Sequence, residues 1–473
     1  MQSRFSFFMP NDEALQYYYD PMSFTSKLPR VMGFAYTSTG SFPFATKNST
    51  KYPYVLRNFD VNTGTIGNAY NTQSTNTDEI VNRLRQMLEH NTIVHESGVN
   101  TINTDEDEYY LSKNGMGIKV KRDENGVISA QGGFQIENER EGLAHTNPGI
   151  LRCNVIEKGD FKNGCTFTLD APLVPASRSV FSVMSGMKRG AKGEPTDSNA
   201  DSIQNENPYA QFFRLCNEAD WDLIVKSGLV DETNPKYDPN TSEGKKALTN
   251  AVNKFLTFVD NNAVDYNVQF FDNYHYTVFA PTNEAVLAAI EQGLPTWESI
   301  QADFENSADE EGYLTNAADS ARIQAKITYL TNFIRTHFAD NSLYADKSEL
   351  NAEMFNSSYD SESGLFGKIW VQRVKDGGET MLQIKDNTGT GEWIKAQYTV
   401  NGRDLKNIMA CDRECNGKVK DQSMNGKTVD ATSYSVIHLV NGVLNHAALV
   451  DGRYPTFEDQ SEARQYLQRF AIR

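Results

Sequence analysis

Two short segments of the chain are close copies of each other. Residues 5–15 read Phe-Ser-Phe-Phe-Met-Pro-Asn-Asp-Glu-Ala-Leu, and residues 276–286 read Tyr-Thr-Val-Phe-Ala-Pro-Thr-Asn-Glu-Ala-Val. In each, an apolar run ends at a proline, Pro10 or Pro281, and the next residue, Asn11 or Thr282, can cap a helix. An apolar run followed by such a residue predicts a strand that leads into an N-capped helix. The chain is therefore predicted to contain two versions of one module.

The repeated pattern resembles the first signature of the fasciclin (FAS1) family, whose usual form is close to T-V-F-A-P-T-N-E-A-F. A second family signature, a strand with a histidine followed by a Gly-Val-Leu turn, matches residues 434–444, which contain His438 and Gly442. The two signatures occur in the right order, about 160 residues apart. In the first copy, residues 165–175 keep the alternating strand and the terminal proline, with Thr168 at the place of the histidine.

The resemblance implies an α+β fold: two tandem FAS1-type β-wedge or sandwich modules flanked by helices. It also implies a non-enzymatic protein of the cell surface that needs no cofactor. The residues that match the signatures are assigned structural roles in the modules: Phe8, Pro10, Glu13, Phe279, Pro281, Thr282, Asn283, Glu284, His337, His438 and Gly442.

Residues 1–185 are predicted to form domain 1, residues 186–207 a linker rich in Gly, Asn and Ser, and residues 208–473 domain 2. Domain 1 is predicted to have a helix over 12–19, a long insertion over 21–77 and a helix over 78–88. Domain 2 has matching apolar spacing over 321–334, which pairs Val81 with Ile327, Leu84 with Leu330, Met87 with Phe333 and Leu88 with Ile334. Hairpin turns are predicted at Asn125-Gly126 and Asp376-Gly377, and a final helix over 460–470.

Residues 208–225 predict an amphipathic helix ahead of the second copy, with Phe212, Leu215, Trp221, Ile224 and Val225 facing inward. Members of the FAS1 family normally open each module with such helices, and the first copy lacks them. We therefore expect that Met1 is not the natural beginning of the protein and that a leader and opening helices lie upstream.

Charge and hydropathy exclude two classes of protein. The formal net charge is -17, and the Lys and Arg residues form no cluster, so a nucleic acid is not expected as a partner. No run of about 18 apolar residues is long enough to span a membrane. The 26 Phe and 22 Tyr residues are enough for packed cores, which predicts a globular chain.

The five cysteines and seven histidines do not form a recognisable catalytic or metal-binding pattern. Cys411 and Cys415 have nearly ligand-like spacing, but a loop disulfide or free thiols are favoured over a metal site. Cys153 and Cys165 flank a predicted hairpin and could form a disulfide under oxidising conditions. His337 lies where the family often has a Tyr-His pair linked to integrin binding, but Thr336 replaces the tyrosine. His337 and His438 are accordingly predicted to hydrogen-bond the backbone of their own module.

The 21–77 insertion is the candidate binding surface. Its aromatic residues stand among Asn, Ser and Thr, a combination that suits sugars or partner proteins, and loops on a rigid scaffold commonly carry binding. The alternative is that these aromatics pack an enlarged domain on itself. The candidate residues are Tyr36, Phe42, Tyr52, Tyr54 and Phe59.

The enlarged loops and the absence of the Tyr-His pair look more like the surface lipoproteins of Bacteroidota than animal matrix proteins. The first hypothesis is a lipid-anchored adhesion or interaction protein of the cell surface or outer membrane. It would dock other surface proteins, possible partners including an outer-membrane nutrient-transporter complex, and its anchor would lie in an N-terminal segment absent from this chain. The second hypothesis is a glycan-binding accessory lipoprotein of a polysaccharide-utilisation system.

Overall fold

The protein is described from a computed structural model. The structure describes residues 4–23, 29–34, 54–60, 63–70, 77–95, 102–105, 107–143, 146–186, 188–189, 195–196, 207–260, 266–268, 270, 275–346, 350–360, 366–389, 391–416 and 428–472.

The chain forms two compact units, and each unit draws on three stretches of sequence. Unit 1 consists of Met1–Ile203, Asp260–Tyr266 and Asn407–Val436, and unit 2 of Gln204–Val259, Asn267–Lys406 and Ile437–Arg473. The packed units thus differ from the linear ranges 1–185 and 208–473, because residues 407–436 pack with the first copy. Both units combine helices with strands, which confirms the α+β class.

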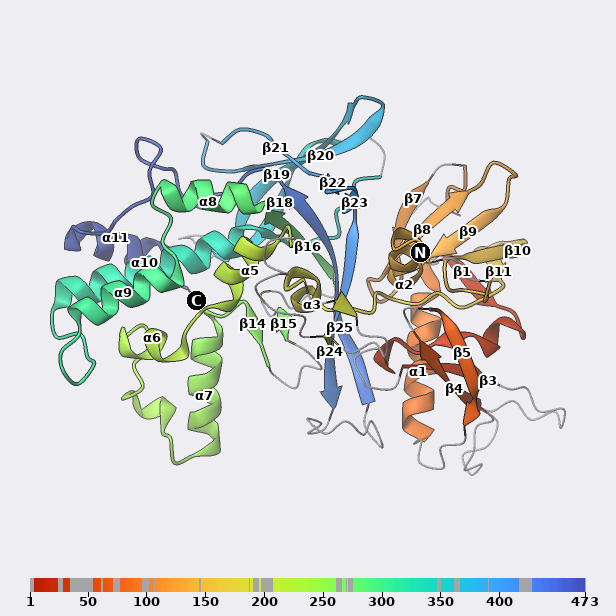
Figure 1. Ribbon diagram of the computed structural model, residues 1–473, viewed down its shortest axis with the longest axis horizontal. Helices are drawn as coiled ribbons and strands as arrows, with labels where there is room; N and C mark the ends of the chain where they lie inside the picture. The colour runs from red at the N-terminus through yellow and green to blue at the C-terminus, as the bar shows by residue number, and fades with distance from the viewer. Residues whose placement is uncertain are drawn as a thin grey trace. The chain divides into compact units, whose positions relative to one another are not determined.

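The main sheet of unit 1 has seven strands in the order β6-β1-β11-β10-β9-β8-β7 (Figure 1). Within this sheet, β1 and β11 run parallel, and their side chains alternate between a buried and a more exposed face. The strands are β1 (Arg4–Pro10), β6 (Thr92–His95), β7 (Glu108–Leu111), β8 (Gly117–Arg122), β9 (Ile128–Gln131), β10 (Cys153–Phe161) and β11 (Gly164–Leu169).

The 21–77 insertion contributes most of a second sheet in unit 1, with the order β2-β3-β4-β5. Its strands are β2 (Tyr18–Tyr19), β3 (Arg30–Phe34), β4 (Tyr54–Asp60) and β5 (Thr65–Tyr70). The unit also contains two short 3-10 turns, η1 (Ala14–Gln16) and η2 (Pro21–Ser23), the helices α1 (Thr77–His90), α2 (Gly133–Arg140) and α3 (Val180–Met184), and a two-stranded piece, β12 (Lys188–Arg189) and β13 (Pro195–Thr196).

Unit 2 is organised around a sheet with the order β21-β20-β19-β18-β17-β16-β25-β24. Its strands are β16 (His275–Pro281), β17 (Phe338–Ala339), β18 (Leu350–Asp360), β19 (Phe366–Asp376), β20 (Glu379–Asp386), β21 (Ile394–Lys395), β24 (Ile408–Asn416) and β25 (Thr428–Val440). The run β17-β16-β25-β24 repeats the run β6-β1-β11-β10 of unit 1. β24 and most of β25 lie in the 407–436 segment of unit 1, so β25 passes from one unit into the other.

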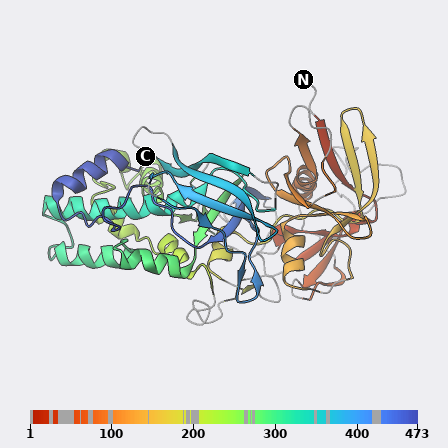
Figure 2. The same ribbon diagram turned by 90° about the horizontal axis from the view of Figure 1, so that it is seen from above.

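Most helices of the structure belong to unit 2. Figure 2 shows α9, α10 and α11 running side by side, and α10 packs against both of the others. The helices and 3-10 turn are α5 (Ala210–Asn217), α6 (Trp221–Lys226), η3 (Pro235–Tyr237), α7 (Ser242–Asn253), α8 (Asn283–Glu291), α9 (Trp297–Ser307), α10 (Ala317–Thr336) and α11 (Gln460–Phe470). Two small strand pairs complete the unit: β14 (Phe258–Val259) with β15 (Asn267–Val268), and β22 (Thr399–Val400) with β23 (Arg403–Asp404).

Two predicted helices and two local features differ from the structure. The helix expected over 12–19 is only the turn η1, because Tyr18 and Tyr19 are buried in β2 and pair with Met32 and Val31. The helix expected over 208–225 is split into α5 and α6. Asp220 causes the break by capping α6, with its Oδ1 accepting from the Leu223 N–H at 2.9 Å.

The other two differences are local. Trp221 is 36% exposed at the start of α6, whereas the prediction placed it inside. The turn between β19 and β20 is formed by Gly377 and Gly378, one residue later than predicted, and both have positive φ, as a two-residue hairpin loop requires.

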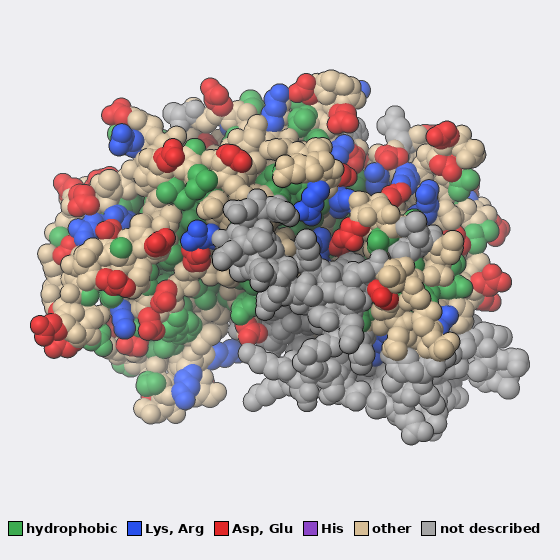
Figure 3. Space-filling view, in the orientation of Figure 1, with side chains coloured by type: hydrophobic (Ala, Val, Ile, Leu, Met, Phe, Trp, Pro, Cys, Tyr) green, Lys and Arg blue, Asp and Glu red, His purple; other side chains and the backbone are tan. Residues whose placement is uncertain are grey.

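None of the helices in the described part of the chain is long and apolar enough to cross a membrane. Figure 3 shows Asp and Glu side chains spread over the visible face and interspersed with Lys and Arg, in keeping with the acidic composition.

Candidate functional site

The second copy of the repeated motif joins β16 to α8 by a tight connection. Phe279 and Pro281 are buried at the end of β16. The Thr282 hydroxyl oxygen caps α8 by accepting from the Ala285 N–H at 3.2 Å, and the Thr282 N–H donates to the Val440 carbonyl of β25 at 2.9 Å. The predicted strand, proline and N-cap are therefore confirmed at this position.

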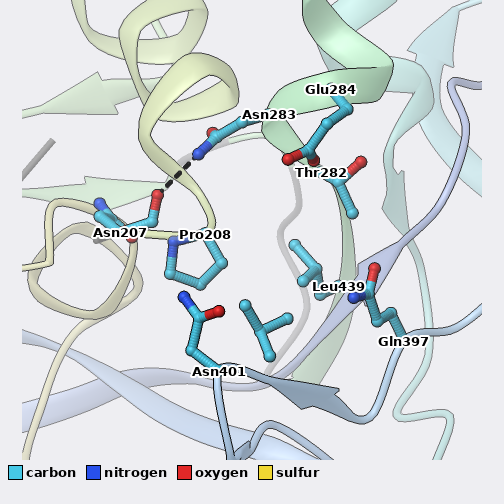
Figure 4. A pocket seen from close by; sticks show the side chains of 9 residues that line it. Asn207, Pro208, Thr282, Asn283, Glu284, Gln397, Asn401 and Leu439 are labelled. Carbon is cyan, nitrogen blue, oxygen red and sulfur yellow. Dashed lines mark hydrogen bonds between the residues drawn. The ribbon is translucent and has the colours of Figure 1, made fainter. Parts of the chain in front are cut away.

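Asn283 links α8 to α5. Its side-chain oxygen accepts from the Gln211 N–H in the first turn of α5 at 2.9 Å, and its Nδ2 donates to the Asn207 carbonyl at 2.9 Å (Figure 4). One amide side chain thus satisfies backbone groups on the segment where α5 begins. Glu284 is exposed in the first turn of α8, where a negative charge is stabilised by the helix dipole.

The motif also borders a small polar pocket of about 150 Å³ in unit 2 (Figure 4). Its volume corresponds to roughly five waters at their share of liquid volume. Among its nine lining residues Glu284 is the one ionisable side chain, so the pocket has no nucleophile paired with a base. The lining residues are Asn207, Pro208, Thr282, Asn283, Glu284, Gln397, Val400, Asn401 and Leu439.

His337 is fully buried at the end of α10 and bonds backbone groups through both ring nitrogens. Its Nδ1 lies 2.9 Å from the Phe333 carbonyl, and its Nε2 accepts from the Leu444 N–H at 2.9 Å. These partners require a neutral ring with the proton on Nδ1. Burial lowers the pKa of His337 to about 4, which keeps the ring neutral at physiological pH.

His438 lies in β25 and is equally buried. Its Nε2 donates to the Leu343 carbonyl at 2.7 Å, and its ring stacks on Phe279 with centroids 5.9 Å apart. Burial lowers its pKa to about 4. The prediction that His337 and His438 hydrogen-bond their own module is confirmed. Gly442 follows β25 where a Cβ would press on the Ile394 side chain at 3.0 Å, so the turn packs closely there.

The first copy repeats two hydrogen bonds of this connection, although a 3-10 turn follows it in place of the helix. Asn11 Oδ1 accepts from the Ala14 N–H at 2.7 Å, and the Asn11 N–H donates to the Leu169 carbonyl at 3.0 Å, as Thr282 does to Val440. Phe8 is buried beside this turn, and Pro10 ends β1. Glu13 is exposed, as its counterpart Glu284 is.

Asn91 occupies the place of His337 in the first copy, as the helix register predicts. The Phe8 N–H donates to the Asn91 carbonyl at 2.8 Å, and the Leu173 N–H donates to Asn91 Oδ1 at 3.3 Å. In unit 2 the Phe279 N–H donates to the His337 carbonyl, also at 2.8 Å. The junction therefore needs a buried acceptor side chain, which either histidine or asparagine can supply.

The residue at the place of His438 is Phe167 and not Thr168, which corrects the sequence alignment. Phe167 stacks on Phe8 with centroids 5.2 Å apart, as His438 stacks on Phe279. The alignment made from the sequence is shifted by one residue. Because side chains alternate along a strand, this shift places Thr168 on the face of the sheet opposite to Phe167.

The candidate binding surface of the insertion is only partly described. Tyr36, Phe42 and Tyr52 lie outside the described residues, and Tyr54 begins β4. Phe59 is 4% exposed and packs between Tyr19 and Phe134, with ring centroids at 5.1 and 6.3 Å. Phe59 is therefore a core residue, which corrects its assignment to a binding surface.

Cys153 and Cys165 are buried thiols, and the disulfide considered for them does not form. In the register of β10 and β11, Cys165 faces Asp160 at one end of the hairpin while Cys153 begins the other end. Seven residues of strand, at about 3.4 Å each, separate those ends, far beyond the reach of a disulfide. Cys216 and Cys411 are also buried and free. Among the residues that the structure describes, no three metal-binding side chains gather.

Sequence reasoning missed a buried polar network on α1 of unit 1. Arg83 is fully buried and pairs with the buried Asp20 at 2.8 Å, and Arg30 pairs with the other oxygen of Asp20 at 2.8 Å. Asp430 accepts from Asn82 at 2.7 Å and from Gln86 at 3.0 Å. The predicted apolar face of this helix is correspondingly incomplete, since Leu88 is 46% exposed. A period-based search gives no signal for charges that are buried because they are paired.

No family model matches this chain, and no curated protein is similar to it. The similar solved structures include a FAS1 domain pair from the insect cell adhesion molecule fasciclin I, with 9% sequence identity and a TM-score of 0.21. That similarity covers 76% of this chain and 80% of the other. A TM-score of this size carries no argument, so the FAS1 resemblance rests on the signature residues described above.

Proposed function

We propose that the protein is a non-enzymatic adhesion or interaction protein of the cell surface, built from two FAS1-type modules. It docks other surface proteins, among them components of an outer-membrane nutrient transporter. A lipid anchor holds it at the membrane.

The observation that carries this proposal is how the signature residues are used. In unit 2 they cap a helix, end a strand or bond the backbone, and in unit 1 Asn91 takes the place of His337 as the acceptor for a backbone N–H. Such residues build a scaffold and do not form a reacting group. A scaffold that carries its function on its surface suits binding to other macromolecules.

The pocket beside α8 supports the same proposal. It is lined by amides, a hydroxyl and one exposed carboxylate. His337 and His438, two of the buried histidines with lowered pKa values, bond backbone carbonyls and an N–H group elsewhere. An active site needs converging titratable groups in a cleft. This pocket offers none among its lining residues.

The test is proximity labelling in the native cells, with the full chain fused to a biotin ligase. We expect enrichment of outer-membrane and surface proteins over a matched exported control of similar charge. Accessibility of the protein to protease added to intact cells should accompany this result. Enrichment no greater than the control, or binding to polysaccharides on a glycan array without enrichment of any protein, would refute the proposal.

A further inference from the structure

The polar pocket beside α8 contains side chains that make few bonds within unit 2. Among the described residues, neither the Glu284 carboxylate nor the Asn401 side-chain amide has a hydrogen-bond partner. Gln397 makes one long bond, from its Nε2 to the Thr399 carbonyl at 3.4 Å. Glu284 comes from α8, Asn401 from the turn between β22 and β23, and Gln397 from the segment before β22. Three elements thus bring polar groups with unused bonding capacity to one small cavity.

The remaining polar side chains of the pocket are already held in place. Thr282 caps α8, and Asn283 bonds both the Gln211 N–H and the Asn207 carbonyl, as Figure 4 shows for the second of these bonds. The Asn207 side-chain oxygen accepts from the Tyr209 N–H at 3.1 Å. This part of the pocket is therefore pre-formed, which lowers the entropic cost of binding a ligand there.

The Asn401 amide is carried by a tight hairpin loop. Val400 pairs with Arg403, so Asn401 and Gly402 form a two-residue loop, and both have positive φ, 50° and 76°. Asparagine and glycine are the residues that such a loop favours. Figure 4 shows the Asn401 amide pointing toward Pro208. The fixed backbone of the loop therefore aims this amide across the pocket.

The charges of the pocket favour an uncharged ligand. Glu284, its one ionisable side chain, lies in the first turn of α8. A helix N-terminus carries about half a positive elementary charge. An anion would be repelled by the carboxylate, and a cation would be opposed by the helix end beside it. A neutral molecule that both donates and accepts hydrogen bonds meets neither cost.

The size and the walls of the pocket narrow the class of neutral ligand. The volume of about 150 Å³ holds roughly five waters. Pro208, Val400 and Leu439 form an apolar wall, and the amides and the carboxylate supply the polar groups. A pyranose sugar has the same division. Its hydroxyls can replace bound waters and keep their hydrogen bonds, while its C–H groups contact apolar side chains.

We propose that this pocket binds one uncharged pyranose unit. The two oxygens of Glu284 accept from neighbouring hydroxyls, and the amides of Gln397 and Asn401 bond others. Because the pocket has room for about one ring, the unit recognised is the end of a neutral glycan chain. This inference goes beyond the proposed docking of surface proteins and does not rest on it.

The test is saturation-transfer NMR on the full chain with the methyl glycosides of glucose, galactose, mannose and N-acetylglucosamine. We expect at least one of them to receive saturation from the protein. Glu284→Gln keeps the shape of the side chain and removes its charge, so it should weaken binding by about tenfold or more. Asn401→Gly keeps the loop and removes the amide, and it should weaken binding by about fivefold.

The matched control is Glu291→Gln, which neutralises an exposed carboxylate at the other end of α8. This variant should bind within about twofold of the unchanged protein, the scatter of a surface substitution. Far-UV circular dichroism and urea unfolding must show all variants folded. If Asn401→Gly disturbs the hairpin, Gln397→Ala replaces it, because this half-buried side chain contributes the other amide.

Three results would overturn the inference. The first is that no methyl glycoside receives saturation. The second is sugar binding that Glu284→Gln and Asn401→Gly leave within about twofold, which would place the sugar elsewhere. The third is binding of N-acetyl-arginine amide that exceeds that of every glycoside and is lost in Glu284→Gln, which would make a cation the occupant. Labelling of surface proteins is measured separately, so the sugar site and the proposed function can each fail alone.

Discussion

Helices α1 and α10 hold the same place in the two units, yet they are covered by different kinds of structure. In unit 2, Tyr329 and Phe333 of α10 lie in an aromatic cluster with residues of α11, including Tyr466 at 5.6 Å from Tyr329. In unit 1 the register puts Arg83 at the place of Tyr329, and Arg83 pairs with Asp20.

The neighbouring positions of the two helices also have different partners in the two units. Gln86 of α1 donates to Asp430, whereas Asn332, its counterpart in α10, donates to the Phe470 carbonyl of α11. His90 bonds the Tyr434 hydroxyl at 2.6 Å. This difference indicates that the contacts of Asn91 and His337 with the sheet fix the register of the helix. The outer face of the helix can pack against either an aromatic or a polar partner. Stability should therefore depend on different chemistry in the two units.

The largest expected difference between the two units is in how much stability each loses at acidic pH. Burial lowers the pKa of His337 and His438 to about 4 and that of His446 to about 3, so the unfolded chain binds more protons than the folded one below the ordinary pKa of 6.5. The stability of unit 2 should be complete above pH 6.5 and fall by about 4 kcal/mol per pH unit as the pH drops toward 4, at about 1.4 kcal/mol for each histidine. Urea unfolding at pH 7, 6 and 5 measures this slope.

Unit 1 provides the comparison for the acid experiment. In unit 1 burial lowers the pKa of His90 to about 3 and also lowers that of His95, whereas in unit 2 it lowers the pKa of His275 besides the three histidines named above. The slope from histidine should therefore be smaller in unit 1 than in unit 2. Equal slopes in two resolved transitions would show that the buried histidines do not control acid stability.

The next largest effect is expected for Asp20→Ala. The substitution leaves the fully buried Arg83 and the nearby Arg30 without their shared carboxylate, which should cost unit 1 about 3–5 kcal/mol. Asp376→Ala, which removes one half of an exposed pair with Lys395 in unit 2, should cost less than about 1 kcal/mol. Differential scanning calorimetry compares the two. A small effect of Asp20→Ala would mean that the arginines are solvated when unpaired.

The junction itself is tested by His337→Ala and His337→Asn. Alanine removes the acceptor for the Leu444 N–H and leaves a buried donor and a cavity, with an expected loss of about 2–4 kcal/mol. Asparagine should recover a large part of that loss, because Asn91 makes the equivalent bond in unit 1. Both are measured by urea unfolding at pH 7. If asparagine is as damaging as alanine, the imidazole itself is required.

The smallest contrast concerns Asn283 and its counterpart Asp12. Asn283→Ala removes two hydrogen bonds to the backbone at the start of α5 and should cost about 1–2 kcal/mol. Asp12 is exposed, so Asp12→Ala should change stability by less than about 0.5 kcal/mol. Hydrogen exchange in α5 should quicken only in the Asn283 variant; unchanged exchange there would contradict the linking role.

The sequence predicts the parts of the fold that depend on local patterns. The strand, proline and N-cap of the second copy, the helix over 460–470 and the alignment of α1 with α10 at Asn91 and His337 are present, and the first copy has the strand and proline but a 3-10 turn in place of the helix. These features are readable because each depends on residues a few positions apart.

Features that depend on distant residues could not be predicted. The segment 407–436 packs with unit 1, and its Asp430 meets Asn82 across almost 350 residues of sequence. The burial of Phe59 likewise depends on Tyr19 and Phe134, which belong to different elements. The exposure of Phe5 and Met9 could not be predicted either, because both are apolar like their buried counterparts Tyr276 and Ala280.

The late position of residues 407–436 in the chain also bears on the timing of synthesis. Unit 1 begins at the N-terminus, yet its last segment ends at Val436. After Ile203 has been added, a ribosome working at about 5–20 residues per second needs roughly 10–50 s to reach Val436. During that interval the α1 side chains that bond Asp430 and Tyr434 in the folded unit lack these two partners. The nascent N-terminal half therefore lacks these partners of α1 until Val436 has been added.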